Sequence, residues 1–156
     1  MNLLVGLIVL SLVYFVFSMH VHFVETLRIQ KYGRGVFTIS SNKYRKSLKG
    51  KKEFTMIASP VKSGESIYLP LKTVAKLVGA RVTSKDDVNK LKIRYYGKII
   101  YVTNENTVAV RDTAYRDMKS IKDAKVSNDE VLLPIETLRR MFGVKIDIEN
   151  NNIILR

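Results

Sequence analysis

Cysteine is absent from this chain of 156 residues, and histidine occurs only at His20 and His22. The lack of cysteine excludes a disulfide framework and a thiolate metal site. Two residues apart on a helix, the two histidines would point about 200° apart, so they could share one ion only on a strand. We therefore expect neither a bound metal nor a cofactor.

Catalytic signatures are missing as well. The sequence contains no Gly-rich phosphate loop, no nucleophile elbow and no zinc-ligand spacing. Its adjacent acids, Asp86-Asp87 and Asp129-Glu130, fall in predicted turns and do not form a pair that converges on a cleft. These absences predict a protein that is not an enzyme.

Charged side chains are absent from residues 1–24, which read MNLLVGLIVLSLVYFVFSMHVHFV. An apolar helix of about 20 residues is long enough to span a bilayer. The segment fits an uncleaved membrane anchor, a cleaved signal peptide or a buried core helix. A signal peptide begins with positive side chains, and none is present here, so we favour the anchor. A cleaved segment would instead make the protein secreted.

Acidic side chains are absent from residues 28–52, which contain nine basic ones. The excess of positive charge, +13 for the whole chain, is therefore concentrated just after the apolar segment. Such a tract favours contact with a polyanion, although a solvated basic face that keeps the protein soluble is the alternative. The candidate polyanion-binding residues are Lys43, Arg45, Lys46, Lys49, Lys51 and Lys52.

Aromatic residues within this tract are few and irregularly spaced, namely Tyr32, Phe37 and Tyr44. Single-stranded nucleic acid is bound by a series of aromatic rings on which bases stack. We therefore expect no sequence-specific nucleic acid as a partner. Outside a Gram-positive cell the tract would meet anionic cell-wall polymer, such as teichoic acid, or lipid headgroups, and inside a cell it would meet nucleic acid or anionic lipid.

A duplication organises the rest of the chain. The segment IYLPLKTVAKLVGARV at residues 67–82 corresponds to VLLPIETLRRMFGVKI at residues 131–146. Four identities recur 64 positions later: Leu69, Pro70, Thr73 and Gly79 become Leu133, Pro134, Thr137 and Gly143.

Each copy has the pattern of a strand, a short helix and a β-hairpin. Proline suits the first helical turn, and glycine suits the left-handed residue after the last one. Apolar residues at helical spacing predict the buried faces: Leu71, Val74, Ala75 and Val78 in the first copy, and Ile135, Leu138 and Phe142 in the second. A helix of roughly two and a half turns is unstable alone, so both must pack on a sheet. The fold class is α+β, with duplicated strand-helix-hairpin units forming an antiparallel sheet behind an N-terminal hydrophobic helix.

These residues also carry a resemblance to a known family. The order Leu-Pro-Leu, helix, Gly-Ala and Val at residues 69–82 resembles the N-terminal stalk domain of bacterial copper amine oxidases, and residues 133–146 repeat it as Leu-Pro-Ile, helix, Gly-Val and Ile. The tryptophan and aspartate usual after this strand are missing in the first unit, and only Asp147 stands there in the second, which leaves the hairpin details open. The resemblance implies a non-catalytic module of secreted and surface proteins of Gram-positive bacteria.

The expected organisation is an anchor or signal at residues 1–24, a basic linker at residues 25–36 and a stalk-like domain at residues 37–156. Its units would cover about 37–106 and 107–156. We expect a membrane-anchored cell-envelope module that acts as a spacer or binds anionic polymer or membrane surface. The alternative is a structural subunit of a larger membrane or secretion assembly, contacting a membrane-protein partner through the helix and the sheet.

The side of the membrane is ambiguous in the sequence. Arg28, Lys31 and Arg34 follow the apolar segment and no basic side chain precedes it, so the positive-inside rule would place the domain in the cytoplasm. The family resemblance implies the opposite side. We expect an extracytoplasmic domain on the cell membrane.

Overall fold

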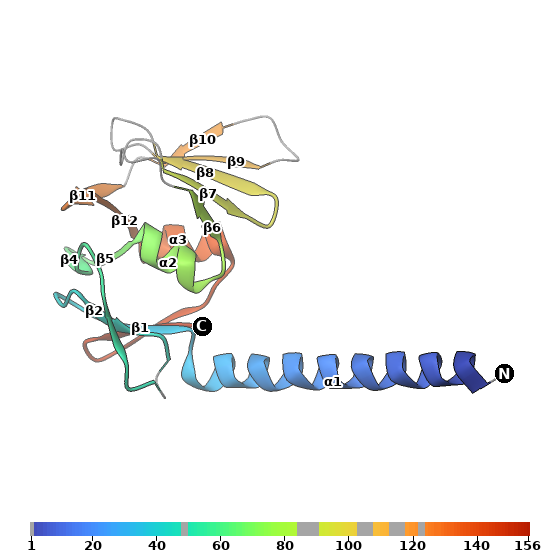
Figure 1. The fold of residues 1–156 in the computed structure, drawn as a ribbon. Coiled ribbons are helices and arrows are strands. Elements are labelled where there is room, and N and C mark those ends of the chain that lie inside the picture. Colours follow the sequence, from blue (N-terminus) through green and yellow to red (C-terminus); the bar gives the residue numbers. More distant parts are fainter. Residues whose placement is uncertain (1, 48–49, 84–90, 103–107, 113–117, 122–123) are drawn as a thin grey trace.

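A long helix projects from a folded domain (Figure 1). The structure is a computed structural model that describes residues 2–47, 50–83, 91–102, 108–112, 118–121 and 124–156. Helix α1 (Asn2–Tyr32) is continuous over 31 residues. Its stretch Val5–Tyr32 is long and apolar enough to cross a membrane, and none of the most apolar part is buried against the domain. The predicted N-terminal hydrophobic helix is therefore confirmed, and the reading as a buried core helix is wrong.

The junction between α1 and the domain is short. Residues 25–36, predicted to be a linker, form the last two turns of α1, then Gly33 and Arg34, then the first residues of β1. The Gly33 backbone N–H donates to the Ile29 carbonyl at 2.8 Å, and the Arg34 N–H donates to the Leu155 carbonyl at 2.6 Å. The helix end is thus tied directly to the last strand.

Fourteen strands are described, and all of their pairings are antiparallel. Those of the first half are β1 (Gly35–Thr38), β2 (Lys43–Arg45), β3 (Glu53–Thr55), β4 (Val61–Ser63), β5 (Ser66–Pro70), β6 (Arg81–Thr83) and β7 (Lys92–Tyr95). Those of the second half are β8 (Lys98–Val102), β9 (Val108–Asp112), β10 (Met118–Ile121), β11 (Lys125–Ser127), β12 (Glu130–Pro134), β13 (Ile146–Glu149) and β14 (Asn152–Leu155). The remaining helices are α2 (Leu71–Leu77) and α3 (Ile135–Phe142).

The duplication is visible in the positions of these elements. The bounds of β4 and β5, moved 64 positions along the chain, are those of β11 and β12. The same shift brings β1, β2 and β3 close to β8, β9 and β10. The repeat in the structure therefore includes strands whose sequences do not visibly match.

The two copies meet at equivalent residues. Strands β5 and β12 pair so that Leu69 lies opposite Leu133, which is its counterpart 64 positions later. On either side, Tyr68 lies opposite Pro134, and Pro70 lies opposite Leu132. Replacing each residue by its equivalent in the other copy turns one of these pairs into the other. Antiparallel pairing of equivalent strands in this register places an approximate twofold axis between Leu69 and Leu133.

The strands are divided among three antiparallel sheets. The central one has the order β11-β12-β5-β4, and the two five-stranded sheets have the orders β10-β9-β8-β7-β6 and β13-β14-β1-β2-β3. Strand β1 pairs with β14, so the sheet that ends the second copy is completed by the strands that begin the domain. The α+β class, with duplicated antiparallel units and short helices, is confirmed.

Both short helices lie in the middle of the domain, between the two five-stranded sheets (Figure 1). The side chains predicted to be buried on them are buried, with Leu71, Val74, Ala75 and Leu138 at 0% exposure. They share one core with Leu69 and Leu133 of the central sheet and with Ile93 and Ile153 of the outer sheets. Helices of 7 and 8 residues are held by this burial, at about 1.5–3 kcal/mol for each large apolar side chain.

Candidate functional site

The predicted basic residues lie on β2, on β3 and on the connection between them. Strand β3 is the edge of its sheet, so this basic segment lies at the rim of the domain. Lys49 lies outside the described residues. Lys51 is exposed and lies just before β3. The remaining four divide into two groups.

Lys43 and Arg45 form the first group. They flank Tyr44 on β2, so their side chains leave the face of the sheet opposite to the tyrosine ring. The Lys43 ammonium lies 3.4 Å from a carboxylate oxygen of Glu53 on β3, and both side chains are more than half exposed. Arg45 lies opposite Glu53 in the strand register. An acid therefore offsets the positive charge of this group.

An aromatic row crosses the other face of the same strands. The rings of Phe37 and Tyr44 are 5.8 Å apart, and those of Tyr44 and Phe54 are 5.5 Å apart. Phe37 is fully buried, whereas Tyr44 and Phe54 are half-buried, so the row runs from the core to the sheet edge. Burial raises the pKa of the Tyr44 hydroxyl above its usual value.

Lys46 and Lys52 form the second group, at the outer end of this row. Their ammonium groups lie 4.8 and 5.5 Å from the centre of the Phe54 ring. Both lysines are exposed, so each is placed by the ring while its charge remains open to solvent. We name Lys46, Lys52 and Phe54 the Phe54 cluster. It can present two neighbouring cations to an anionic ligand.

Sequence reasoning missed Phe54, although it predicted both lysines. The only signal for Phe54 was that it lies two residues after Lys52, in a short segment that forms the strand Glu53–Thr55. The Phe54 ring is positioned beside both lysines because Phe54 pairs with Tyr44 of the neighbouring strand. This pairing is a tertiary contact, which the local sequence does not indicate.

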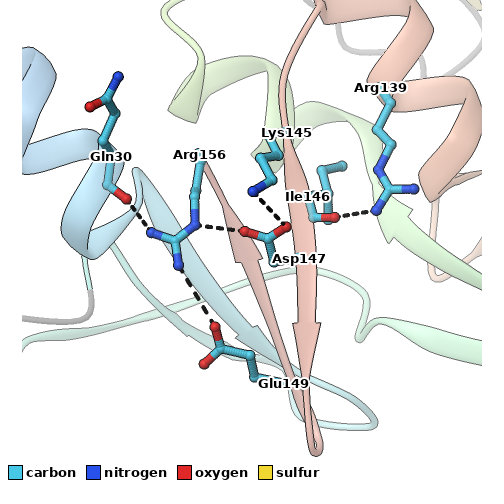
Figure 2. A network of polar contacts seen from close by, with 7 residues as sticks. All are labelled: Gln30, Arg139, Lys145, Ile146, Asp147, Glu149 and Arg156. Atoms are coloured by element: carbon cyan, nitrogen blue, oxygen red, sulfur yellow. Dashed lines mark hydrogen bonds and ion pairs between the residues drawn. The ribbon is translucent and has the colours of Figure 1, made fainter.

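A second polar cluster fixes helix α1 to the domain, and Figure 2 shows it. The Arg156 Nε donates to a carboxylate oxygen of Asp147 at 2.7 Å, and its Nη2 lies 3.7 Å from Glu149. Its Nη1 donates to the backbone carbonyl of Gln30 in the last turns of α1. The hydrogen bond from Arg156 and the charge of Lys145, 3.5 Å away, hold the pKa of Asp147 below its usual value.

No group of three or more histidine, cysteine, aspartate or glutamate side chains able to hold a metal ion occurs among the described residues. His20 and His22 both lie in α1, two residues apart. Of the acids tested as a catalytic pair, Asp86 and Asp87 lie outside the described residues.

Comparison with known protein families gave one match. A family model described as copper amine oxidase N-terminal domain matches residues 48–155, which is more than half of the chain. The match begins between β2 and β3 and continues to the last residue of β14, so it covers the twofold core. The comparisons with curated proteins and with solved structures gave no match.

Proposed function

The chain belongs to the copper amine oxidase N-terminal domain family, a non-catalytic module of amine oxidases, and from this premise we propose that it is a membrane-anchored, non-enzymatic module of the cell envelope. In this proposal the module binds an anionic cell-wall polymer or lipid headgroups, or serves as a spacer. The observation that carries the proposal is the Phe54 cluster, in which two exposed ammonium groups flank one ring.

The position of the cluster supports a role in binding. Lysines that only kept the protein soluble would have no reason to converge on one ring. Here Lys46 and Lys52 come from opposite ends of the β2–β3 connection and meet at Phe54. The nearest acid in the register, Glu53, pairs with Lys43 instead. Each basic residue close to an anionic surface contributes about 1 kcal/mol, so the cluster adds to the general attraction of a +13 chain.

The exposure of α1 supports membrane anchoring. Its apolar side chains, such as Leu10 at 69% and Phe17 at 65%, have no protein surface to cover them. Burying this area in a bilayer is favourable, whereas leaving it in water is not. An extracytoplasmic domain on the cell membrane is part of the proposal because the family module is expected outside the cell. Protease treatment of intact cells, followed by detection of the domain, tests that side.

Binding is tested with a matched pair of double variants of the full chain in detergent. Lys46→Gln with Lys52→Gln removes the two cations of the Phe54 cluster, and Lys62→Gln with Arg81→Gln removes the same charge from exposed positions elsewhere. We expect the cluster variant to lose roughly tenfold or more of its affinity for purified teichoic acid or anionic vesicles, and the control to lose much less. The difference should shrink as salt screens the contact. Equal losses in the two variants would exclude the cluster as the site.

A structural subunit of a larger membrane assembly is the second candidate. It is favoured by small residues on α1, where a side chain added at Gly6 would meet no atom within 4 Å. Small residues allow two membrane helices to approach closely. Gly6→Leu should then abolish detergent-stable co-purification with a membrane partner while leaving polymer binding unchanged. Retention of a partner by this variant would contradict the assembly role of the helix.

A further inference from the structure

The hairpin formed by β7 and β8 has an unusual residue at its turn. Tyr95 pairs with Lys98, so the loop contains only Tyr96 and Gly97. Their φ angles are 39° and 75°, and two positive values define the type I′ turn that suits antiparallel hairpins. Such turns select Asn, Asp or Gly, because a bulky side chain at positive φ is strained.

The other turns of this protein follow that preference. Among the described residues, the non-glycine positions with positive φ are Ser40, Asn128, Asp129, Asn150 and Tyr96, so only Tyr96 is bulky. The tyrosine gains nothing in return by burial, since it is 89% exposed. A strained conformation that burial does not explain points to a role outside the fold.

The β7–β8 hairpin packs on the core of the domain through its first strand. The Tyr95 ring packs edge-on against Phe142 of the core, 5.2 Å between centres, and the Tyr96 ring lies edge-on to Tyr95 at 4.6 Å. Burial raises the pKa of the Tyr95 hydroxyl, Tyr96 adds to the rise, and the Arg34 guanidinium opposes it. Arg34, two residues beyond α1, therefore lies within electrostatic range of the Tyr95 hydroxyl. The turn points to the same side of the domain as that toward which α1 extends (Figure 1).

The chemistry of tyrosine fits the layer into which the turn points. The apolar part of α1 ends near Val24, and the eight residues 25–32 continue the helix for about 12 Å and include Glu25, Arg28 and Lys31. This polar segment crosses the headgroup region. An aromatic ring with a hydroxyl is favoured at that depth, because one end is apolar and the other forms hydrogen bonds with water and headgroups.

We propose that Tyr96 inserts into the headgroup layer of the bilayer that α1 crosses, so that the domain contacts the membrane at two points and has a fixed tilt. The partner is the lipid interface itself, and the contact needs no lipid charge. The inference rests on the proposed anchoring by α1. It goes beyond that anchoring, because α1 alone leaves open the tilt that the helix and the domain attached to it take in the bilayer.

The absence of tryptophan makes the test direct, because any tryptophan introduced is the only one in the chain. Three variants of the full chain would be placed in neutral phosphatidylcholine vesicles, with or without brominated lipid. Tyr96→Trp reads the hairpin turn, Tyr14→Trp reads the anchor, and Ile148→Trp reads β13, where Ile148 is 50% exposed. The β13–β14 hairpin points away from α1 in Figure 1.

We expect tryptophan at positions 14 and 96 to emit at shorter wavelength and to be quenched by brominated lipid, and tryptophan at position 148 to show neither effect. Quenching at position 14 with none at position 96 would overturn the second contact and leave the anchor in place. No quenching at position 14 would overturn the anchor and the contact together. Equal quenching at positions 96 and 148 would show a domain lying on the surface without a preferred face, which also contradicts the proposal.

A second measurement guards against disturbance of the turn by the larger indole ring. The chain has no cysteine, so Tyr96→Cys gives a unique site for a nitroxide. The labelled protein would be compared in two samples: in vesicles, and in buffer where an amphipol covers α1 in place of lipid. We expect the label to be less accessible to a water-soluble relaxation agent in the vesicles. Equal accessibility in the two would overturn the proposal without reference to fluorescence.

Discussion

The two copies of the strand-helix-hairpin unit share a centre and differ at their ends. At the centre, Leu69 and Leu133 are fully buried and lie opposite each other. At the ends, β13 and β14 are joined by the two residues Asn150 and Asn151, whereas eight residues separate β6 from β7. The residues that pack the two copies together are thus alike in the two copies, and the peripheral connections differ.

The helices show the same contrast. The backbone N–H of Lys72 in the first turn of α2 donates at 2.9 Å to Glu130, which is 3% exposed and belongs to the second copy. The residue equivalent to Glu130 is Ser66, which is exposed and has no such bond in the described structure. Arg139 in α3 donates to the Ile146 carbonyl of β13 (Figure 2), whereas its equivalent in α2 is the buried Ala75. The second copy therefore caps α2 of the first through Glu130 and ties its own helix α3 to β13 through Arg139.

The divergence has a consequence for function. The second hairpin carries Arg156, which binds α1, and the first hairpin leads into the turn that holds Tyr96. The symmetric centre joins the two copies, and the asymmetric second hairpin connects them to α1.

The largest expected effect tests the symmetric centre. Leu69→Ala and Leu133→Ala should each lower the free energy of unfolding by about 2–5 kcal/mol, because each leaves a cavity in a fully buried position. Their equivalent surroundings predict similar costs, measured by urea denaturation of the full chain in detergent. Ile57→Ala, at a side chain that is 56% exposed, is the control and should change stability by less than about 0.5 kcal/mol. A cost at one leucine several times that at the other would contradict the twofold relation.

A smaller effect is expected where the two helices end. Gly79 and Gly143 have φ of 81° and 62°, and an added Cβ would meet no atom within 4 Å at either. Ala at each position should cost about 1–2 kcal/mol from backbone strain alone. Asn is the control, since it tolerates this conformation, and it should restore most of the loss in thermal unfolding. A stable Gly143→Ala variant beside a destabilised Gly79→Ala would show that the two ends are not equivalent.

The next effect concerns the polar contacts found only in the second copy. Arg156→Gln removes the partner of Asp147 and should cost about 1 kcal/mol at neutral pH, since Asp147 stays 27% exposed to solvent. The pKa of Asp147 is lowered from 3.8, so its contribution to stability is complete above that pH and is lost as pH falls through the lowered value.

The free energy of unfolding should therefore fall less steeply at acid pH in Arg156→Gln than in the unaltered protein. Lys145→Gln removes a longer contact of the same carboxylate, 3.5 Å, from a side chain that is 74% exposed, and should change the profile much less. Superimposable acid limbs for Arg156→Gln and the parent would refute the role of this ion pair.

The smallest effect concerns the cap that one copy supplies to the other. Burial raises the pKa of Glu130 from 4.5, although the Lys72 N–H and the charges of Lys72 and Lys76 oppose the rise. The native state thus holds the proton more tightly, and Glu130 makes stability fall as pH rises from 4.5 through the raised value.

Glu130→Gln keeps the carbonyl that accepts from Lys72 and removes this decline. We expect a change within about 1 kcal/mol, with the variant gaining on the parent between acid and neutral pH. Glu136→Gln, at a side chain that is 70% exposed, is the control in the same denaturation series. Parallel profiles for Glu130→Gln and the parent would contradict a buried, proton-linked cap.

Much of this fold could be predicted because the spacing of apolar residues along the chain indicates which side chains are buried. The recurrence of Leu-Pro and Gly, 64 residues apart, located both helices, and helical spacing identified Val74 and Leu138 as core residues. The candidate site was harder. Charge composition identified Lys46 and Lys52, but nothing local indicated that Phe54 would gather them while Glu53 paired with Lys43.

By itself, the sequence determined the apolar helix, the α+β class, the duplication and the membership of a non-catalytic family, because each of these is carried by residue type and spacing along the chain. Only the tertiary structure decided that Leu69 meets Leu133, that β14 closes on β1, and that Arg156 reaches Gln30. Such contacts join residues far apart in sequence. Their geometry is set by the simultaneous packing of both copies, which no local pattern encodes.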